Sequence, residues 1–157
     1  MKSRTILLTL ALALAALAGC KSQYEMLLAS NDVDAKYEAA MNYFSNKKYQ
    51  KAAQLFESMT MLTKGTARDD TVQYYWGLSN YRYKDYYTAE SNFAKFIENF
   101  PMSPFTPDAK FYRLDCMYRA TYRYELDQNP TRACINAISE FIRENPNDGY
   151  VQSCLLM

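Results

Sequence analysis

Residues 74–101 read YYWGLSNYRYKDYYTAESNFAKFIENFP and carry small, aromatic and proline residues at the spacing of a helical hairpin. Gly77 is followed by Ala89, by Phe93 one helical turn later, and by Pro101 at the end of the stretch. In two antiparallel helices, this order brings a small residue of each helix to the contact and packs the ring beside it. Pro101 then ends the second helix, because proline cannot donate a backbone hydrogen bond. The stretch therefore predicts a pair of antiparallel helices.

A second copy of this pattern lies earlier in the chain. Its small residues and its ring are Ala40, Ala52 and Phe56, each 37 positions before its counterpart (Ala40 against Gly77). Tetratricopeptide repeats (TPRs) have a period of about 34 residues and the same small-residue, A-x3-F and proline pattern. The first two units therefore resemble TPRs with a lengthened connection between them.

A third copy follows Pro101 and departs further from the pattern. Asp115 stands where a small residue belongs, Cys134 and Ile138 take the places of Ala and Phe, and residues 124–130 enlarge the inner loop. We expect an all-α, TPR-type helical solenoid with repeats at residues 34–66, 70–103 and 107–146 and the start of a fourth at 148–157. Because solenoids normally end in a polar capping helix, and SCLLM is not one, we also expect a longer natural protein.

The composition argues against an enzyme and against a nucleic-acid-binding protein. The 157 residues include 15 Tyr and no His, which excludes His-based triads, general bases and metal sites. There is no G-x-S-x-G motif to suggest a hydrolase. The formal net charge is +1, so nothing electrostatic favours nucleic acid. We expect no enzymatic activity, no cofactor and no metal.

The N-terminus predicts a lipoprotein signal peptide over residues 1–19. Lys2 and Arg4 precede an apolar segment at residues 6–18, which is too short to span a bilayer of about 30 Å. The sequence LAGC resembles a bacterial lipobox, which implies lipidation of Cys20 and stable anchoring. An ordinary secretory signal is the alternative. By analogy with the sorting of known lipoproteins, Lys21 directly after the lipid site favours the outer membrane over retention in the inner membrane. Residues 20–33 are expected to be the lipidated end and a tether.

The first helices of TPR units expose a groove, and their register predicts the residues that line it. Tyr37, Tyr74 and Tyr112 fall on equivalent positions and should form a ladder. Amphipathic rings with few charges suit an extended or partly unfolded apolar peptide. Packing of these side chains between repeats is the alternative, and Arg82 and Arg119 are either solvated charges or ligands for a peptide carboxylate. The predicted groove consists of Tyr37, Met41, Phe44, Tyr74, Leu78, Tyr81, Arg82, Tyr112, Cys116 and Arg119.

Three cysteines remain beyond Cys20, which is an odd number for an oxidising compartment. Cys116 and Cys134 fall on the paired helices of one repeat and could form a disulfide, although Cys134 is also explained as a small residue at the helix contact. Cys154 is the third.

The combination of lipobox, tether and repeats resembles the BamD (ComL) family of outer-membrane assembly lipoproteins. The second helices end in FIENFP and FIRENP, and a long loop at residues 125–130 enters the last of them. The resemblance covers residues 20–157. It implies a helical solenoid on the periplasmic face of the outer membrane, within the β-barrel assembly machinery.

The same resemblance implies the partners. N-terminal repeats of the family recognise unfolded outer-membrane proteins, and C-terminal repeats dock the periplasmic domains of the barrel-forming subunit BamA. Substrate binding would then fall on the predicted groove, and much of the BamA-docking part would lie beyond this chain. The alternative function is another periplasmic TPR lipoprotein that serves as a scaffold for envelope or cell-division coordination.

Overall fold

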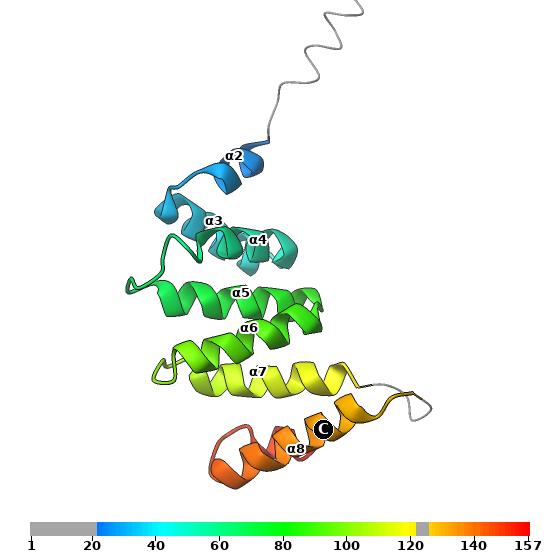
Figure 1. The fold of residues 1–157 in the computed structure, drawn as a ribbon. Coiled ribbons are helices and arrows are strands. Elements are labelled where there is room, and N and C mark those ends of the chain that lie inside the picture. The colour runs from blue at the N-terminus through cyan, green and yellow to red at the C-terminus, as the bar shows by residue number, and fades with distance from the viewer. Residues whose placement is uncertain (1–21, 122–125) are drawn as a thin grey trace, which may run out of the picture. The chain divides into compact units, whose positions relative to one another are not determined.

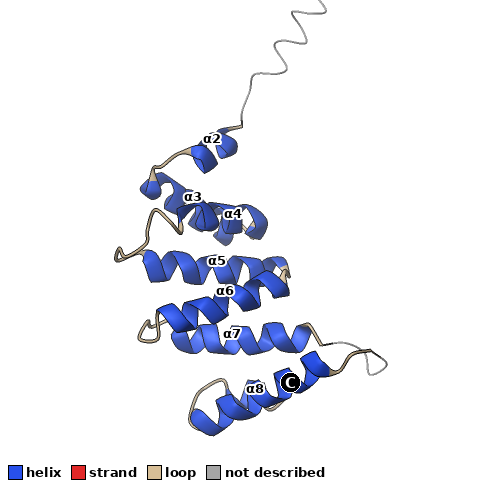
Figure 2. Cartoon of the chain, in the orientation of Figure 1, coloured by secondary structure: helices blue, strands red, loops and turns tan. Residues whose placement is uncertain are grey.

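The computed structural model describes residues 22–121 and 126–157, and every regular element in them is a helix. Figure 2 shows these helices and the loops that join them. In chain order they are α2 (Gln23–Ala29), α3 (Val33–Ser45), α4 (Tyr49–Met59), α5 (Asp69–Tyr83), α6 (Tyr86–Asn99), α7 (Thr106–Arg119), α8 (Asn129–Glu144) and α9 (Val151–Cys154). The predicted signal peptide and Cys20 lie outside the described residues. None of the described helices is both long and apolar enough to cross a bilayer.

The chain divides into two compact units, with the boundary between Asp32 and Val33. In the described part of the first unit, a short helix, α2, occupies half of the segment expected to be a tether. Ser22 and Glu25 form a capping box, in which each side chain accepts a hydrogen bond from the other residue's backbone N–H. The sequence did not predict α2, because its seven residues span too few turns to show an amphipathic period.

In the second unit, helices α3 to α8 stack in chain order as antiparallel neighbours, which confirms the predicted helical-repeat fold (Figure 1). The small residues Ala40, Ala52 and Ala89 have no exposed surface. A Cβ atom added to Gly77 would lie 3.0 Å from the Phe93 ring, so this ring packs directly on the α5 backbone. The spacing of these small and aromatic residues in the sequence therefore predicted which residues meet where the helices pack.

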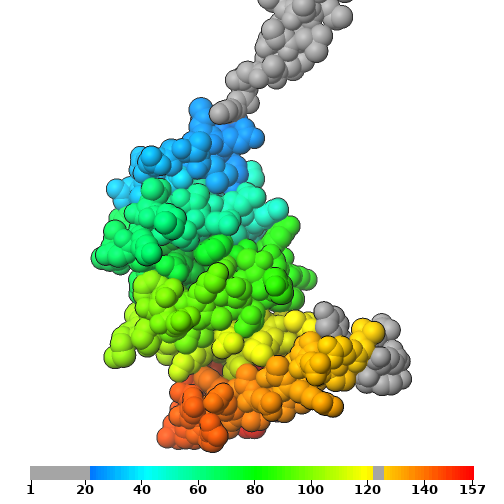
Figure 3. Space-filling model, viewed as in Figure 1, coloured from blue at the N-terminus to red at the C-terminus, as the bar shows by residue number. Residues whose placement is uncertain are grey.

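Aromatic rings continue the core from one repeat to the next. The ring of Phe56 stacks on Tyr75 across the first two repeats, with centroids 5.8 Å apart, and Phe93 stacks on Tyr112 across the next two, at 5.7 Å. In the space-filling view, side chains fill the intervals between these helices (Figure 3). Buried rings of this size contribute much of the stability of a small helical domain.

The buried core of the third repeat differs from the cores of the first two repeats. Leu114 of α7, Phe141 of α8 and Cys154 of α9 form a separate buried cluster. The Phe111 ring stacks on Tyr150, with centroids 4.2 Å apart, and the Tyr150 hydroxyl donates to Asp108 at 2.7 Å. Residues after α8 therefore pack back on α7.

Candidate peptide-binding surface

Three residues of the predicted groove are buried. Tyr74 is 5% exposed, Leu78 is 7% exposed and Cys116 has no exposed surface. The Tyr74 ring stacks on Phe105, with centroids 4.5 Å apart and planes within 12°. Phe105 immediately precedes α7, so the next repeat covers this part of α5. These three residues therefore correct the groove interpretation: they pack between repeats, as the alternative proposed.

The expected tyrosine ladder is replaced by contacts with other rings. Tyr37 meets the edge of Phe56, with centroids 6.3 Å apart, and Tyr112 packs on Phe93 and on Tyr81. Phe44 is half-buried and makes edge contacts with Tyr49 and Tyr75. Met41 is also half-buried. Whether the accessible parts of Tyr37, Met41, Phe44 and Tyr112 bind a peptide stays a prediction.

Tyr81 and Arg119, also predicted for the groove, meet at the buried carboxylate of Asp115. Asp115 is 6% exposed and accepts hydrogen bonds from the Tyr81 hydroxyl, at 2.6 Å, and from the Arg119 guanidinium. The same guanidinium lies 5.4 Å from the centre of the Tyr86 ring. Because Asp115 balances its charge, Arg119 is a poor choice for binding a peptide carboxylate. The contact also explains why a carboxylate occupies a position where TPRs have a small residue.

Arg82 is the second cation predicted for the groove. Its side chain is exposed, and its guanidinium lies 5.9 Å from the centre of the Tyr81 ring. A cation held beside an aromatic ring keeps its hydrogen-bond donors available for a ligand. Of the two predicted arginines, Arg82 therefore fits anion recognition better.

Tyr81 makes stability sensitive to alkaline pH. Burial, and then the hydrogen bond to Asp115, raise the pKa of Tyr81 to about 12 from an ordinary value of 10.0. A neutral group with a raised pKa stabilises the fold fully below pH 10.0, and this contribution is lost as the pH rises through about 12. We expect Tyr81→Phe to flatten this part of the stability profile, measured by urea unfolding at a series of pH values. The same fall in both proteins would contradict the assignment.

An apolar pocket of about 200 Å³ adjoins this cluster, between α6, α7 and the start of α8. We call it the Tyr86 pocket. Among the described residues that line it, the one charged side chain is Glu90, which is paired with Arg113 at 2.8 Å. Tyr87 at the edge of the pocket is 88% exposed. A pocket with aromatic and aliphatic walls and few polar groups suits an apolar side chain. It is lined by Tyr86, Tyr87, Glu90, Cys116, Met117, Ala120, Pro130 and Ala133.

Sequence reasoning placed only Cys116 of this pocket in the groove. The others lie on α6, on α8 and at the C-terminal end of α7, and α8 begins only at Asn129. The adjacent rings Tyr86 and Tyr87, at the start of a second helix, were the available signal, because one of two consecutive helical residues must face away from the core.

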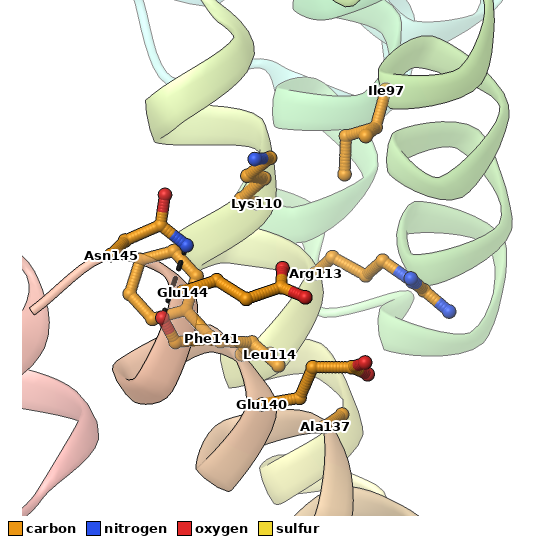
Figure 4. A pocket seen from close by; sticks show the side chains of 9 residues that line it. All are labelled: Ile97, Lys110, Arg113, Leu114, Ala137, Glu140, Phe141, Glu144 and Asn145. Carbon is orange, nitrogen blue, oxygen red and sulfur yellow. Dashed lines mark hydrogen bonds between the residues drawn. The ribbon is translucent and has the colours of Figure 1, made fainter.

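A second pocket, of about 150 Å³, lies between the same three helices, toward the C-terminal ends of α6 and α8 (Figure 4). Lys110 and Arg113 approach it from α7, and Glu140 and Glu144 from α8. The Asn145 side chain donates to the Phe141 carbonyl oxygen at 3.0 Å, as the dashed line shows. Because its walls bring together charges of both signs, this pocket is less suited to an apolar peptide than the Tyr86 pocket.

The described cysteines are free thiols, and all three are buried. The disulfide considered between Cys116 and Cys134 is not formed. Burial is the main cause that raises the pKa of Cys116 to about 12, and it also raises the pKa of Cys134 and of Cys154. These thiols are therefore protonated and unreactive at neutral pH. Within the described ranges, His, Cys, Asp and Glu form no group able to hold a metal.

Comparison with known proteins places this repeat fold in a family. A family model described as "YfiO: Outer membrane lipoprotein" matches residues 29–156, which include all the described helices from α3 to α9 and both pockets. A search of curated proteins finds no match. The chain belongs to the YfiO family of outer membrane lipoproteins.

Proposed function

We propose that this protein is a non-enzymatic, BamD-type component of the β-barrel assembly machinery. A lipid on Cys20 holds it at the periplasmic face of the outer membrane. There it acts as a scaffold, contacts the periplasmic domains of the barrel-forming subunit BamA and binds unfolded outer-membrane proteins before their insertion. The observation that carries this proposal is membership of the outer membrane lipoprotein family over residues 29–156.

The Tyr86 pocket is the site we assign to the unfolded substrate. Strands destined for a membrane barrel alternate apolar and polar residues and carry aromatic girdles. The pocket has room for one apolar side chain, and Tyr87 beside it offers a largely exposed ring. An extended segment can thus place one apolar side chain in the pocket and a second one against the Tyr87 ring.

Substrate binding at the Tyr86 pocket can be tested at Tyr87. A photoreactive phenylalanine at position 87 should crosslink to an unfolded outer-membrane protein, whereas the same residue at Met61, 78% exposed on the first repeat, should not. Tyr87→Ala should weaken binding of an unfolded barrel about tenfold, as expected for an aromatic binding hot spot, and Met61→Ala should leave it unchanged. Equal crosslinking from both positions would argue against the pocket.

Membership of the assembly machinery is tested by co-purification. The full-length lipoprotein, purified from envelopes in mild detergent, should bring a large outer-membrane barrel subunit with it. Recovery of cell-division or cell-wall proteins in its place would support the alternative scaffold function. Replacing Cys20 with serine should prevent processing and lipid attachment, and unchanged processing would contradict the lipid anchor.

A further inference from the structure

A basic cleft of about 420 Å³ lies between the turn that joins α3 to α4 and the turn that joins α5 to α6. Five of its lining residues are cations, and none of the described residues lining it is Asp or Glu. The whole chain is almost balanced, with 18 basic and 17 acidic residues, so this concentration of one sign is local. The cleft is lined by Lys47, Lys48, Tyr49, Gln50, Lys51, Arg82, Tyr83 and Lys84.

Two of the cations occupy backbone positions where glycine is energetically preferred. Lys47 has φ 59° and Lys84 has φ 70°, and both lie in the left-handed region. The positions correspond, since Lys84 follows Lys47 by the same 37 residues that separate Gly77 from Ala40. Lysine is unfavourable at each position for the backbone alone. Both turns nevertheless carry lysine, and both lysines line the cleft.

The two turns also share a backbone hydrogen-bond pattern, which places Lys47 and Lys84 at equivalent positions. In the first turn, the Lys48 N–H donates to the Tyr43 carbonyl at 2.8 Å, and in the second the Asp85 N–H donates to the Asn80 carbonyl at 3.0 Å. The Asp85 side chain does not line the cleft, because it caps α6 by accepting from the Thr88 N–H at 3.2 Å. The Asp85 carboxylate follows Lys84 directly in the sequence, but it is directed to the N-terminus of α6 and not into the cleft.

Aromatic rings and lysine side-chain stems complete the cleft. The ammonium groups of Lys48 and Lys51 lie 5.9 and 5.5 Å from the centre of the Tyr43 ring. Both ammonium groups are therefore positioned beside the same ring. Tyr49 and Tyr83 line the cleft, and Tyr83 is 49% exposed. Tyrosine beside lysine is the combination that proteins place at the headgroup level of a bilayer.

We propose that the basic cleft binds the phosphate headgroup of an anionic phospholipid at the membrane surface. A phosphodiester concentrates its charge on two oxygens, which suits several cations converging on one compact cleft, whereas the carboxylates of an acidic peptide are spread along a chain. Membership of an outer membrane lipoprotein family places such headgroups nearby at high local concentration. The cleft would then orient the first two repeats against the membrane.

Lysine footprinting on the full-length lipoprotein tests this proposal without any substitution. The protein is reconstituted into vesicles of phosphatidylcholine, alone or with three-tenths phosphatidylglycerol, and its amines are acetylated with a neutral reagent. The four cleft lysines should be acetylated several-fold more slowly in the anionic vesicles, and high salt should abolish the difference. Exposed Lys64 and Lys95 lie outside the cleft and serve as internal controls. Equal rates in both vesicles would overturn the proposal.

Two added probes distinguish other anions from the lipid. Inorganic phosphate is added to the phosphatidylcholine vesicles in one arm and hexaglutamate in another. Protection by inorganic phosphate equal to that by phosphatidylglycerol would make the cleft a site for free phosphate and overturn its assignment to lipid. Stronger protection by hexaglutamate would make it a surface for an acidic peptide and likewise overturn it.

Two double variants distinguish the effect of the cleft charges on lipid binding from any effect on folding. Lys47→Gly with Lys84→Gly should keep or raise the thermal midpoint, because glycine adopts the left-handed backbone without strain. It should also weaken association of the cleft with anionic lipid about 25-fold, from about fivefold for each lysine at an anionic surface. Lys64→Gln with Lys95→Gln removes the same charge elsewhere and should retain protection. If the glycine variant unfolds, Lys48→Gln with Lys51→Gln provides the same test, and retained protection of the remaining cleft lysines would contradict the proposal.

Discussion

Replacing Phe93 with alanine should lower the free energy of unfolding by about 3–5 kcal/mol, the range for large rings deleted from a packed core. Phe93 has no exposed surface, and its ring lies against the Gly77 backbone. It also contacts the rings of Tyr74 and Tyr112, so its loss opens a cavity among α5, α6 and α7. Because glycine at position 77 has no side chain to fill this space, the cavity should persist. Urea unfolding followed by circular dichroism measures the effect.

Tyr87→Ala is the matched control for Phe93→Ala. It removes an aromatic side chain from the same helix, but Tyr87 is 88% exposed. A surface substitution of this kind should change stability by less than about 0.5 kcal/mol. Similar losses in the two variants would show that Phe93 is not the centre of the helix contact.

Breaking the hydrogen bond between Tyr81 and Asp115 should cost about 1.5–3 kcal/mol, the range for hydrogen bonds to a charged group. The Tyr81 hydroxyl donates to Asp115 at 2.6 Å and thereby joins the first helices of the second and third repeats. Tyr81→Phe removes the hydroxyl and keeps the ring that packs on Tyr86 and Tyr112. Thermal unfolding of this variant should show the loss.

A double-mutant cycle with Asp115→Asn isolates that bond from the pair between Asp115 and Arg119. The coupling energy between positions 81 and 115 should be favourable and should account for most of the effect of Tyr81→Phe. Arg119→Gln should cost less, because the Arg119 side chain is 44% exposed and its pair is screened by solvent. A coupling energy near zero would mean that the hydroxyl acts only through packing.

The fold was largely predictable because its signal is local. Gly77, Ala89 and Phe93 report a contact between two helices that are adjacent in the chain, and the structure confirms this contact. Helix α2 was missed because a short capped helix carries little periodicity. Asp115 looked like a departure from the repeat pattern, and its reason became visible only with Tyr81 and Arg119 beside it.

The candidate site was much less predictable from the register of single helices. The groove interpretation treated the outward side of each first helix as free, but Phe105 from the following connection covers Tyr74. The Tyr86 pocket combines residues of α6, α7 and α8. Two of these residues, Tyr87 and Pro130, are far apart in the sequence. A single repeat carries no information on which of its surfaces the next repeat will bury.

The sequence by itself determined the helix pairs, their order and the residues at their contacts, because these depend on spacing within one repeat. Only the tertiary structure decided which side chains remain accessible, because burial depends on how each repeat stacks on the next. The lysines at positions 47 and 84 show the difference most clearly. In the sequence they are two isolated turn residues, whereas in the stacked repeats they line one basic cleft.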